Sequence, residues 1–149
     1  MKQIGMAMSG GVDSTASALL LSEHYTVRGF LMDIGQPRFA EQAEQVETIS
    51  GRLGIDLKIV DLKARFQKIV LDYFIDSYKN GKTPNPCMIC NREIKCGLFL
   101  EHILSTGLDA MAVHTVGLRF KRYLGQMSYV LGMIWAALTD RVRRIRITI

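Results

Sequence analysis

The sequence predicts an α/β fold with a mainly parallel, doubly wound sheet flanked by helices, and three observations support this prediction. Short continuous apolar runs alternate along the chain with longer segments whose apolar residues recur at helical spacing. The glycine-rich stretch "SGGVDS" stands where the first apolar run passes into the first helix-like segment. No linker or low-complexity tract divides the 149 residues, which are therefore expected to form one domain.

Each strand and helix is predicted from its own pattern of apolar residues. Short, mostly apolar runs indicate strands that a parallel sheet buries on both faces. Helices are indicated where apolar residues recur every three or four positions, and glycines at 54 and 81 end two of them. The elements expected in chain order are a strand at 4–8, a helix at 14–23, a strand at 27–32, a helix at 40–53, a strand at 57–62, a helix from 66 to the glycine at 81, a helix at 91–105 and a strand at 109–113.

Residues 118–149 are interpreted as a divergent C-terminal part of the same domain. An apolar run at 129–138 is too short to span a bilayer and is predicted to be a core or interface helix. Residues 142–149 alternate apolar with basic or polar side chains, which favours an edge strand. The basic side chains of this tail are interpreted as a solvated face, with phosphate contacts as the alternative. They are Arg141, Arg143, Arg144 and Arg146.

Composition and charge narrow the class of function. A net charge of +5 and a pI near 9.3 favour anionic partners such as nucleotides or nucleic acid. The sequence shows neither a signal peptide nor a membrane-spanning run, so a cytoplasmic protein with no membrane partner is expected. Three cysteines, an odd number, indicate free thiols or metal ligands in a reducing compartment.

The stretch "SGGVDS", residues 9–14, has the chemistry of a phosphate-binding turn. Gly10 and Gly11 let backbone approach an anion closely, and the helix that follows offers unpaired N–H groups and partial positive charge. Ser9 and Ser14 add hydroxyl donors, and Asp13 is expected either to cap the helix or to hold a Mg²⁺ that bridges phosphates. Neither a Walker A loop nor the dinucleotide fingerprint fits these letters. A turn without a ligand is the alternative.

A second informative segment, residues 81–97, carries the pair Cys87 and Cys90 in a C-x-x-C spacing. Asn91 is expected to cap the helix that follows, and a thiol near a helix N-terminus with Arg92 and Lys95 close by should have a lowered pKa. The thiolate is the form that carries sulfur, attacks it or binds metal.

Four interpretations of these thiols stay open. The first is a nucleophile or sulfur carrier with a second cysteine that resolves it. The second is an iron–sulfur cluster that adds Cys96, and the third is a zinc site that adds His102. The fourth is a structural role as small buried hydrophobes, which is the expectation for Cys96.

The two motifs resemble known families. "SGGVDS" is similar to the pyrophosphate-binding loop of the PP-loop, or N-type, ATP pyrophosphatases, whose fold is adenine nucleotide α-hydrolase-like and Rossmann-like. These enzymes cleave ATP between its α and β phosphates. The resemblance implies that 1–149 is a single PP-loop ATP pyrophosphatase-like domain that uses ATP and Mg²⁺, with Asp13 as a catalytic residue. The residues implied in holding the phosphates are Ser9, Gly10, Gly11, Val12, Asp13 and Ser14.

The segment "TPNPCMICNREIK", residues 83–95, resembles the tRNA-specific 2-thiouridylase family, and the likeness covers roughly residues 3–113. It implies adenylation of the wobble uridine of tRNA, followed by sulfur delivery through a cysteine persulfide supplied by a donor protein. Cys90 matches the family's first catalytic cysteine, and Cys87 stands where many members have an aspartate and others a cysteine. Met32 matches a position whose backbone touches adenine.

After residue 112 the chain departs from that family. Where the family has Ala-Thr-Gly-His-Tyr-Ala-Arg this chain reads "AVHTVGLR", and "LGQMSYVL" lacks a Lys–Asp pair. The family's second catalytic cysteine and its tRNA-binding domains are not found among these residues, so Cys87 and Cys96 are the candidates to resolve a persulfide on Cys90, and a Cys87–Cys90 pair is the hypothesis. Two alternatives remain: an ATP pyrophosphatase of the same loop class with another substrate, and a nucleotide- or partner-binding remnant without catalysis.

Overall fold

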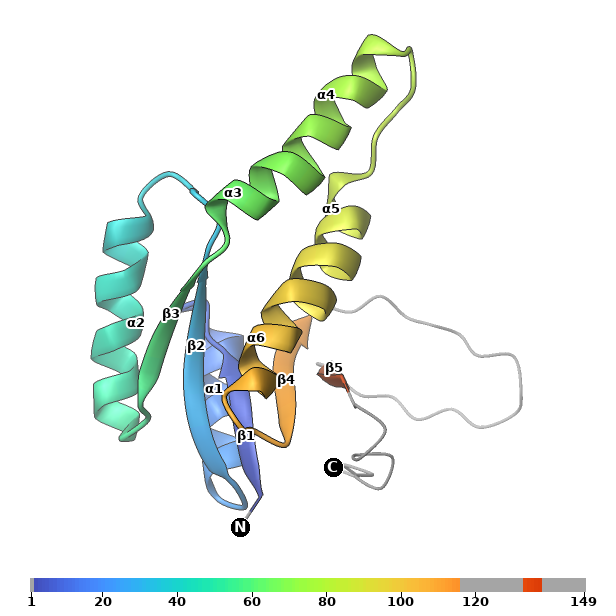
Figure 1. The fold of residues 1–149 in the computed structure, drawn as a ribbon. Helices are drawn as coiled ribbons and strands as arrows, with labels where there is room; N and C mark the ends of the chain where they lie inside the picture. The colour runs from blue at the N-terminus through green and yellow to red at the C-terminus, as the bar shows by residue number, and fades with distance from the viewer. Residues whose placement is uncertain (1, 116–132, 138–149) are drawn as a thin grey trace.

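The apolar runs form a five-stranded sheet in the computed structural model, which describes residues 2–115 and 133–137 (Figure 1). The strand order is β3-β2-β1-β4-β5. The first four strands are parallel, and the last pairs antiparallel with β4. The strands are β1 (Gln3–Ala7), β2 (Thr26–Asp33), β3 (Leu57–Asp61), β4 (Ala110–Thr115) and β5 (Met133–Ala137).

Two helices connect the first three strands, and a helical hairpin connects the third to the fourth. The first arm of the hairpin comprises α3, η1 and α4, and the second comprises α5, η2 and α6. Figure 1 shows the hairpin reaching beyond the sheet at the carboxyl ends of the parallel strands. The helical segments are α1 (Val12–Ser22), α2 (Phe39–Leu53), α3 (Lys63–Phe66), η1 (Gln67–Leu71), α4 (Asp72–Lys79), α5 (Pro86–Ile89), η2 (Cys90–Phe99) and α6 (Leu100–Ser105).

Both arms of the hairpin contain a π-helical stretch, in which each N–H bonds to the carbonyl five residues earlier. In η2 the backbone N–H of Leu100 donates to the carbonyl of Lys95, and after η1 that of Asp72 donates to Gln67. A π-helix is wound more widely than an α-helix, so residues five apart become neighbours along one side. Lys95 therefore comes close to Cys90.

Apolar side chains cover both faces of the sheet, as the parallel strands require. One face packs against α1 and α2 through Ala18, Leu21 and Val46. The other packs against the hairpin through a cluster centred on Phe30 of β2 and Phe99 of η2, both fully buried. Helices on both faces make the sheet doubly wound, as predicted, with crossovers that exchange faces between β3 and β4.

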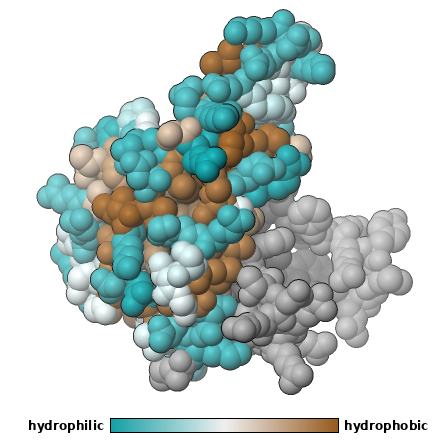
Figure 2. Space-filling model, in the orientation of Figure 1, coloured by the Kyte–Doolittle hydropathy of each residue, from teal (hydrophilic) through white to brown (hydrophobic). Residues whose placement is uncertain are grey.

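The base of the hairpin packs closely on the sheet. A Cβ atom at Gly5 of β1 would overlap Ile103 Cγ2 of α6, so this position requires glycine. Farther out, the Asn85 N–H donates to the Tyr73 hydroxyl at 3.3 Å and joins the two arms. In Figure 2 the free end of the hairpin is mostly hydrophilic, whereas apolar residues are visible at its base.

The four parallel strands and the first two helices confirm the sequence prediction within a few residues. The helix expected at 91–105 instead begins at Pro86, because Asn85 rather than Asn91 is its N-cap and accepts a hydrogen bond from the Met88 N–H at 3.1 Å.

The helix expected at 129–138 is wrong where the structure describes it. Met133–Ala137 forms β5, which pairs with the outer edge of β4 and satisfies backbone groups that an open edge would expose. A short apolar run does not by itself distinguish a buried helix from a strand. The edge strand expected at 142–149 and the arginines of the tail lie outside the described residues.

Within the described ranges, 2–115 and 133–137, no helix combines the length and the apolar character needed to cross a bilayer.

Candidate functional site

The glycine-rich loop follows β1 and folds back on itself through the Ser14 side chain. Ser14 Oγ donates to the Gly11 carbonyl at 3.0 Å and accepts from the Ser9 hydroxyl at 3.1 Å and the Ser9 N–H at 3.3 Å. Gly10 has a φ of +81°, a left-handed conformation that favours glycine. Gly11 occupies the N-cap position of α1, so Asp13, expected as a possible cap, lies in the first turn instead.

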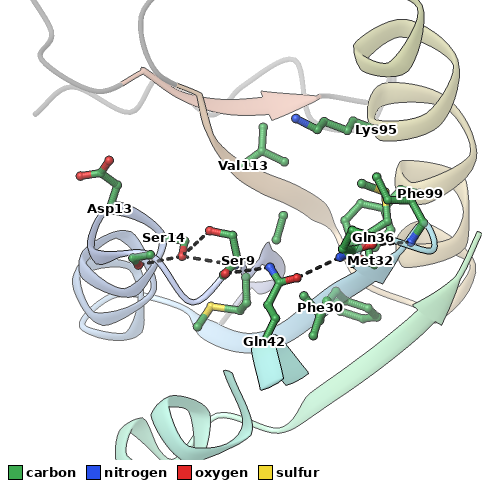
Figure 3. A pocket seen from close by; sticks show the side chains of 15 residues that line it. Ser9, Asp13, Ser14, Phe30, Met32, Gln36, Gln42, Lys95, Phe99 and Val113 are labelled. Atoms are coloured by element: carbon green, nitrogen blue, oxygen red, sulfur yellow. Dashed lines mark hydrogen bonds between the residues drawn. The ribbon is translucent and has the colours of Figure 1, made fainter. Parts of the chain in front are cut away.

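A cavity of about 400 Å³ lies between this loop, the end of β2 and the second arm of the hairpin (Figure 3). Volumes of this size are typical of small-molecule sites. The loop, β2, the segment after β2, α2, η2 and β4 all contribute side chains. The lining residues are Ala7, Met8, Ser9, Gly11, Asp13, Ser14, Phe30, Leu31, Met32, Ile34, Gln36, Gln42, Lys95, Phe99 and Val113.

Most of the predicted phosphate and adenine residues meet at this cavity. Ser9, Gly11, Asp13 and Ser14 border it from the loop, and Met32 borders it from β2. Gly10 and Val12 are not among the described residues that line it, and the Val12 side chain is largely exposed. The cavity lies at the carboxyl ends of the strands, beside the point where the strand order reverses between β1 and β4. Ligands of open α/β sheets bind at this place.

Ion pairs fix the chain just beyond β2. The Asp33 carboxylate is nearly buried and accepts from Lys63 Nζ at 3.1 Å and from the Gly35 N–H at 2.9 Å. Lys63 also pairs with Asp61 of β3 at 3.2 Å. Hydrogen bonds to both carboxylates raise the pKa of Lys63, and the hydrogen bonds from Lys63 lower the pKa of Asp61. Through Lys63, the segment after β2 that carries Gln36 is therefore tied to the ends of β2 and β3.

The predicted cysteine pair lies in the first turns of the second arm, outside the lining of the cavity. Cys87 is exposed and Cys90 is half-buried, and the two are separated by less than one helical turn. Lys95 and Phe99, farther along the same arm, do line the cavity. One continuous helix thus carries both the thiols and part of the cavity wall.

The expected lowering of the Cys90 pKa is wrong. Burial raises the pKa of the Cys90 thiol, and the ammonium of Lys95 opposes this only in part, while Cys87 adds to it. Arg92, which was expected to help, pairs with Glu93 at 2.6 Å. The helix begins at Pro86, so Cys90 lies beyond the first turn, where the favourable field of the helix N-terminus has fallen off.

Cys96 does not have the buried structural role expected from its place on a helix, because its side chain is exposed. The three cysteines do not converge into a metal site. Among the residues that the structure describes, no three His, Cys, Asp or Glu side chains are grouped so that they could hold a metal ion. The iron–sulfur and zinc interpretations thus find no ligand set in this part of the chain.

Among the lining residues that the sequence did not point to are two glutamines. Gln36 and Gln42 extend into the cavity from the segment after β2 and from α2. Their positions in polar stretches give no periodic or motif signal, because a glutamine there is also compatible with a solvated surface.

Fold and site together define a doubly wound α/β protein of the Rossmann type, with a glycine-rich turn that borders a cavity at its topological switch point. Residues 2–121 match the family described as tRNA methyl transferase HUP domain. The match covers most of the chain, and the chain belongs to this family.

Curated relatives carry a more specific name. The chain is 51% identical over 108 residues to the tRNA-specific 2-thiouridylase MnmA of Desulfotalea psychrophila. The matched region covers 72% of this chain and 31% of that protein. It is 36% identical over 146 residues to the protein of the same name from Carboxydothermus hydrogenoformans, covering 89% of this chain and 40% of that one. The chain thus spans between about a third and two fifths of the length of these relatives.

A solved structure supports the fold assignment. A protein from Methanocaldococcus jannaschii, described as a predicted subunit of tRNA methyltransferase, superposes with a TM-score of 0.54 at 19% identity. The likeness covers 87% of this chain and 59% of that one, and at this level of identity it concerns the fold alone.

Proposed function

We propose that this chain provides the ATP-dependent part of a tRNA 2-thiouridylase-like sulfurtransferase, acting in the cytoplasm. One observation carries the proposal: the helix that bears Cys87 and Cys90 continues into Lys95 and Phe99, which line the same cavity as the glycine-rich loop. A thiol that carries sulfur and a loop that binds phosphate, both held by the same fold, suit a two-step reaction. ATP first activates a carbon atom of the substrate, and sulfur then attacks that atom.

The first step would be adenylation. The wobble uridine O2 attacks the α-phosphorus of ATP, a P–O bond forms, and the bond to the bridging oxygen breaks as pyrophosphate leaves. The N3 proton of the uridine passes to solvent in this step and is regained when 2-thiouridine is released. Gly10, Gly11 and the N–H groups at the start of α1 would hold the leaving pyrophosphate. Asp13 lines the cavity and fits a Mg²⁺ shared with the phosphates, because this ion commonly takes one or two carboxylates together with phosphate oxygens. The ion would supply neutralisation of phosphate charge.

The second step would transfer sulfur. A persulfide on Cys90, formed by a sulfur donor protein, attacks C2 of the adenylated uridine through its terminal sulfur, and AMP leaves with the former O2. The Cys87 thiolate then attacks Cys90 Sγ, which releases 2-thiouridine and leaves a Cys87–Cys90 disulfide. A dithiol reductant reopens the disulfide and supplies two electrons. The short separation of the two cysteines along one helix supports Cys87 as the resolving thiol.

Sulfur transfer is favoured over the methyl transfer in the family's description. Two thiols on the helical arm that also lines this cavity have a task in thiolation, whereas transfer of a methyl group requires no C-x-x-C pair. The second candidate is an ATP pyrophosphatase of the same loop class that acts on another substrate. It is kept because the chain covers only 31% to 40% of these relatives. The third candidate, a nucleotide- or partner-binding remnant without catalysis, predicts that the chain does not cleave ATP.

The test is release of pyrophosphate from ATP by the purified chain in magnesium buffer, with and without tRNA that lacks the thio group. Release that depends on tRNA, together with 2-thiouridine detected by mass spectrometry after addition of a persulfide donor, would support the proposal. Release without any effect of tRNA would favour another substrate. Binding of ATP without release would favour the remnant, and absence of binding would overturn the nucleotide site itself.

The matched variant for this test is Asp13→Asn. It keeps the size of the side chain and removes the charge that would hold Mg²⁺. Pyrophosphate release should fall by about a hundredfold or more if the ion is shared with the phosphates. Asp109→Asn serves as the control, because that carboxylate lies at the start of β4 and accepts from the Gln3 N–H, at the opposite end of the sheet.

A further inference from the structure

Two glutamine side chains join the glycine-rich loop to the end of β2 through an uninterrupted series of hydrogen bonds (Figure 3). Gln42 Nε2 donates to the Ser9 carbonyl at 2.9 Å. Gln36 Nε2 donates to Gln42 Oε1 at 2.9 Å and to the Met32 carbonyl at 3.4 Å. The series thus starts at the first residue of the loop and ends on the strand that forms the other side of the cavity.

Hydrogen bonding fixes the orientation of both amides. Gln36 Oε1 accepts from the Ile34 N–H at 3.0 Å, so the amino group of Gln36 must face Met32 and Gln42. Gln42 in turn accepts through its oxygen and donates through its nitrogen. Rotating either amide by half a turn would oppose two oxygens or two donors.

The surroundings hold the two glutamines in place. Gln36 follows Gly35, which is tied to the Asp33–Lys63 pair, and Gln42 lies in the first turns of α2. Both line the cavity, and the bonds that Gln36 donates to Gln42 and to the Met32 carbonyl are partly buried. A side chain needed only for solubility would not be held as these are: Gln36 makes three hydrogen bonds, and Gln42 makes two, one of them to Ser9, 33 residues away in the sequence.

We propose that Gln36 and Gln42 are positioning residues that set the separation between the phosphate-binding loop and the end of β2. Their effect is on ligands that touch both ends of the cavity at once, a nucleoside triphosphate above all, and much less on ligands that touch one end. The inference rests on the proposed function in one respect, namely that this cavity takes ATP.

The physical reason is preorganisation. The loop belongs to the β1–α1 connection and Met32 belongs to β2, so a ligand that spans them must hold both at one distance. Where the bridge formed by Gln36 and Gln42 already fixes that distance, binding does not have to order the two ends. Without the bridge the ligand bears this cost, whereas a short ligand such as pyrophosphate does not.

The experiment compares ATP, inorganic pyrophosphate and adenosine by calorimetry with the full chain in magnesium buffer. Gln42→Ala and Gln36→Ala should each weaken ATP binding by about tenfold, the size expected for loss of one or two partly buried hydrogen bonds. Binding of pyrophosphate and of adenosine should change by less than about twofold. Because the two amides act in series, the double variant should weaken ATP binding no more than the stronger single one.

Gln45→Ala is the matched control. This glutamine lies on the same helix and donates to the Gly10 carbonyl at 3.2 Å, yet it is exposed and makes no bond to the bridge that the structure records. Its loss should leave all three affinities within about twofold. Should Gln42→Ala fail to fold, Gln42→Glu keeps the volume and the acceptor for Gln36 but sets a carboxylate against the Ser9 carbonyl, and the same pattern is expected.

Three patterns of weakened binding would overturn the inference: pyrophosphate weakened as much as ATP, additive losses in the double variant, or a control as damaging as the bridge variants. Each would reduce the glutamines to general supports of the loop. If the unmodified chain binds ATP and the bridge variants bind it equally well, this inference alone fails. If the unmodified chain does not bind ATP, the proposed function fails with it.

Discussion

The glycine-rich loop and the cysteine-bearing turn differ in how completely the protein has built them before any substrate arrives. Ser14 is 3% exposed, and its hydroxyl makes hydrogen bonds with three other groups of the loop. Cys87, by contrast, is exposed, and Cys90 is half-buried with a thiol whose pKa is raised by burial. The preformed loop suits a small ligand such as a nucleotide. The more open cysteine-bearing turn suits a large substrate that brings its reactive base to the thiols.

The largest expected effect separates the two regions by function. Cys90→Ser should lower 2-thiouridine formation by about a hundredfold or more, because a hydroxyl does not carry persulfide sulfur. The affinity for ATP should stay within about twofold, since Cys90 does not line the cavity.

Cys96→Ser is the control for that loss, because Cys96 is an exposed thiol on the same helical arm. Retained thiolation in Cys90→Ser, measured by mass spectrometry of digested tRNA, would show that Cys90 is not the carrier. Loss of thiolation in both variants would point to a general requirement for thiols.

The next effect tests how rigid the loop must be. Gly10→Ala should lower the free energy of unfolding by about 1–2 kcal/mol, because φ is +81° there and the new Cβ would lie 3.2 Å from Val46 Cγ2. Gly11→Ala is the matched control. Its φ of −76° is open to alanine, and its nearest neighbour, Ser9 Oγ, would lie 3.6 Å away.

Urea unfolding of the two variants gives the comparison directly. Equal midpoints would mean that the left-handed turn at Gly10 is not a constraint on the loop. A loss confined to Gly10→Ala, together with weaker ATP binding, would tie phosphate affinity to the shape of the turn rather than to its composition.

The smallest effect concerns the electrostatic link between the regions. Lys95 lowers the pKa of the Cys90 thiol against the larger effect of burial, which raises it. Lys95→Met should therefore raise that pKa further and slow alkylation of Cys90 by iodoacetamide at pH 8 by roughly two- to threefold. In the unmodified chain the alkylation rate should reach half its maximum at a higher pH than for free cysteine.

Arg92→Met is the corresponding control, since the Arg92 guanidinium is engaged with Glu93. Its alkylation profile, followed by peptide mass spectrometry, should match that of the unmodified chain. A larger change in Arg92→Met than in Lys95→Met would reverse the assignment of the charge that acts on Cys90.

The sequence predicted what depends on local pattern and missed what depends on distant contacts. Continuous apolar runs predicted the four parallel strands, and the glycines of the turn predicted one wall of the cavity. The pair Gln36 and Gln42 could not be predicted, because its significance lies in bonds between segments that the fold brings together.

The cysteine region shows a second reason for failure. Proximity to a helix start predicted a lowered pKa for Cys90, but the true start at Pro86 and the packing around the thiol reversed the direction. Burial on one side of a helix is not visible in a motif of four residues. A short apolar run is likewise ambiguous, because it is compatible with a buried helix and with a strand. Met133–Ala137 forms β5 where a helix was expected.

The wide winding of η2 has a consequence for the length of the chain there. Five residues of a π-helix turn about as far as four residues of an α-helix, because each hydrogen bond reaches one residue farther. Losing a single residue between Cys90 and Phe99 would therefore let one turn of the arm rewind as an ordinary α-helix with little rotation of the residues before it. Both thiols would keep roughly the same side of the arm relative to Phe99, but the five-residue spacing that brings Lys95 close to Cys90 would be lost.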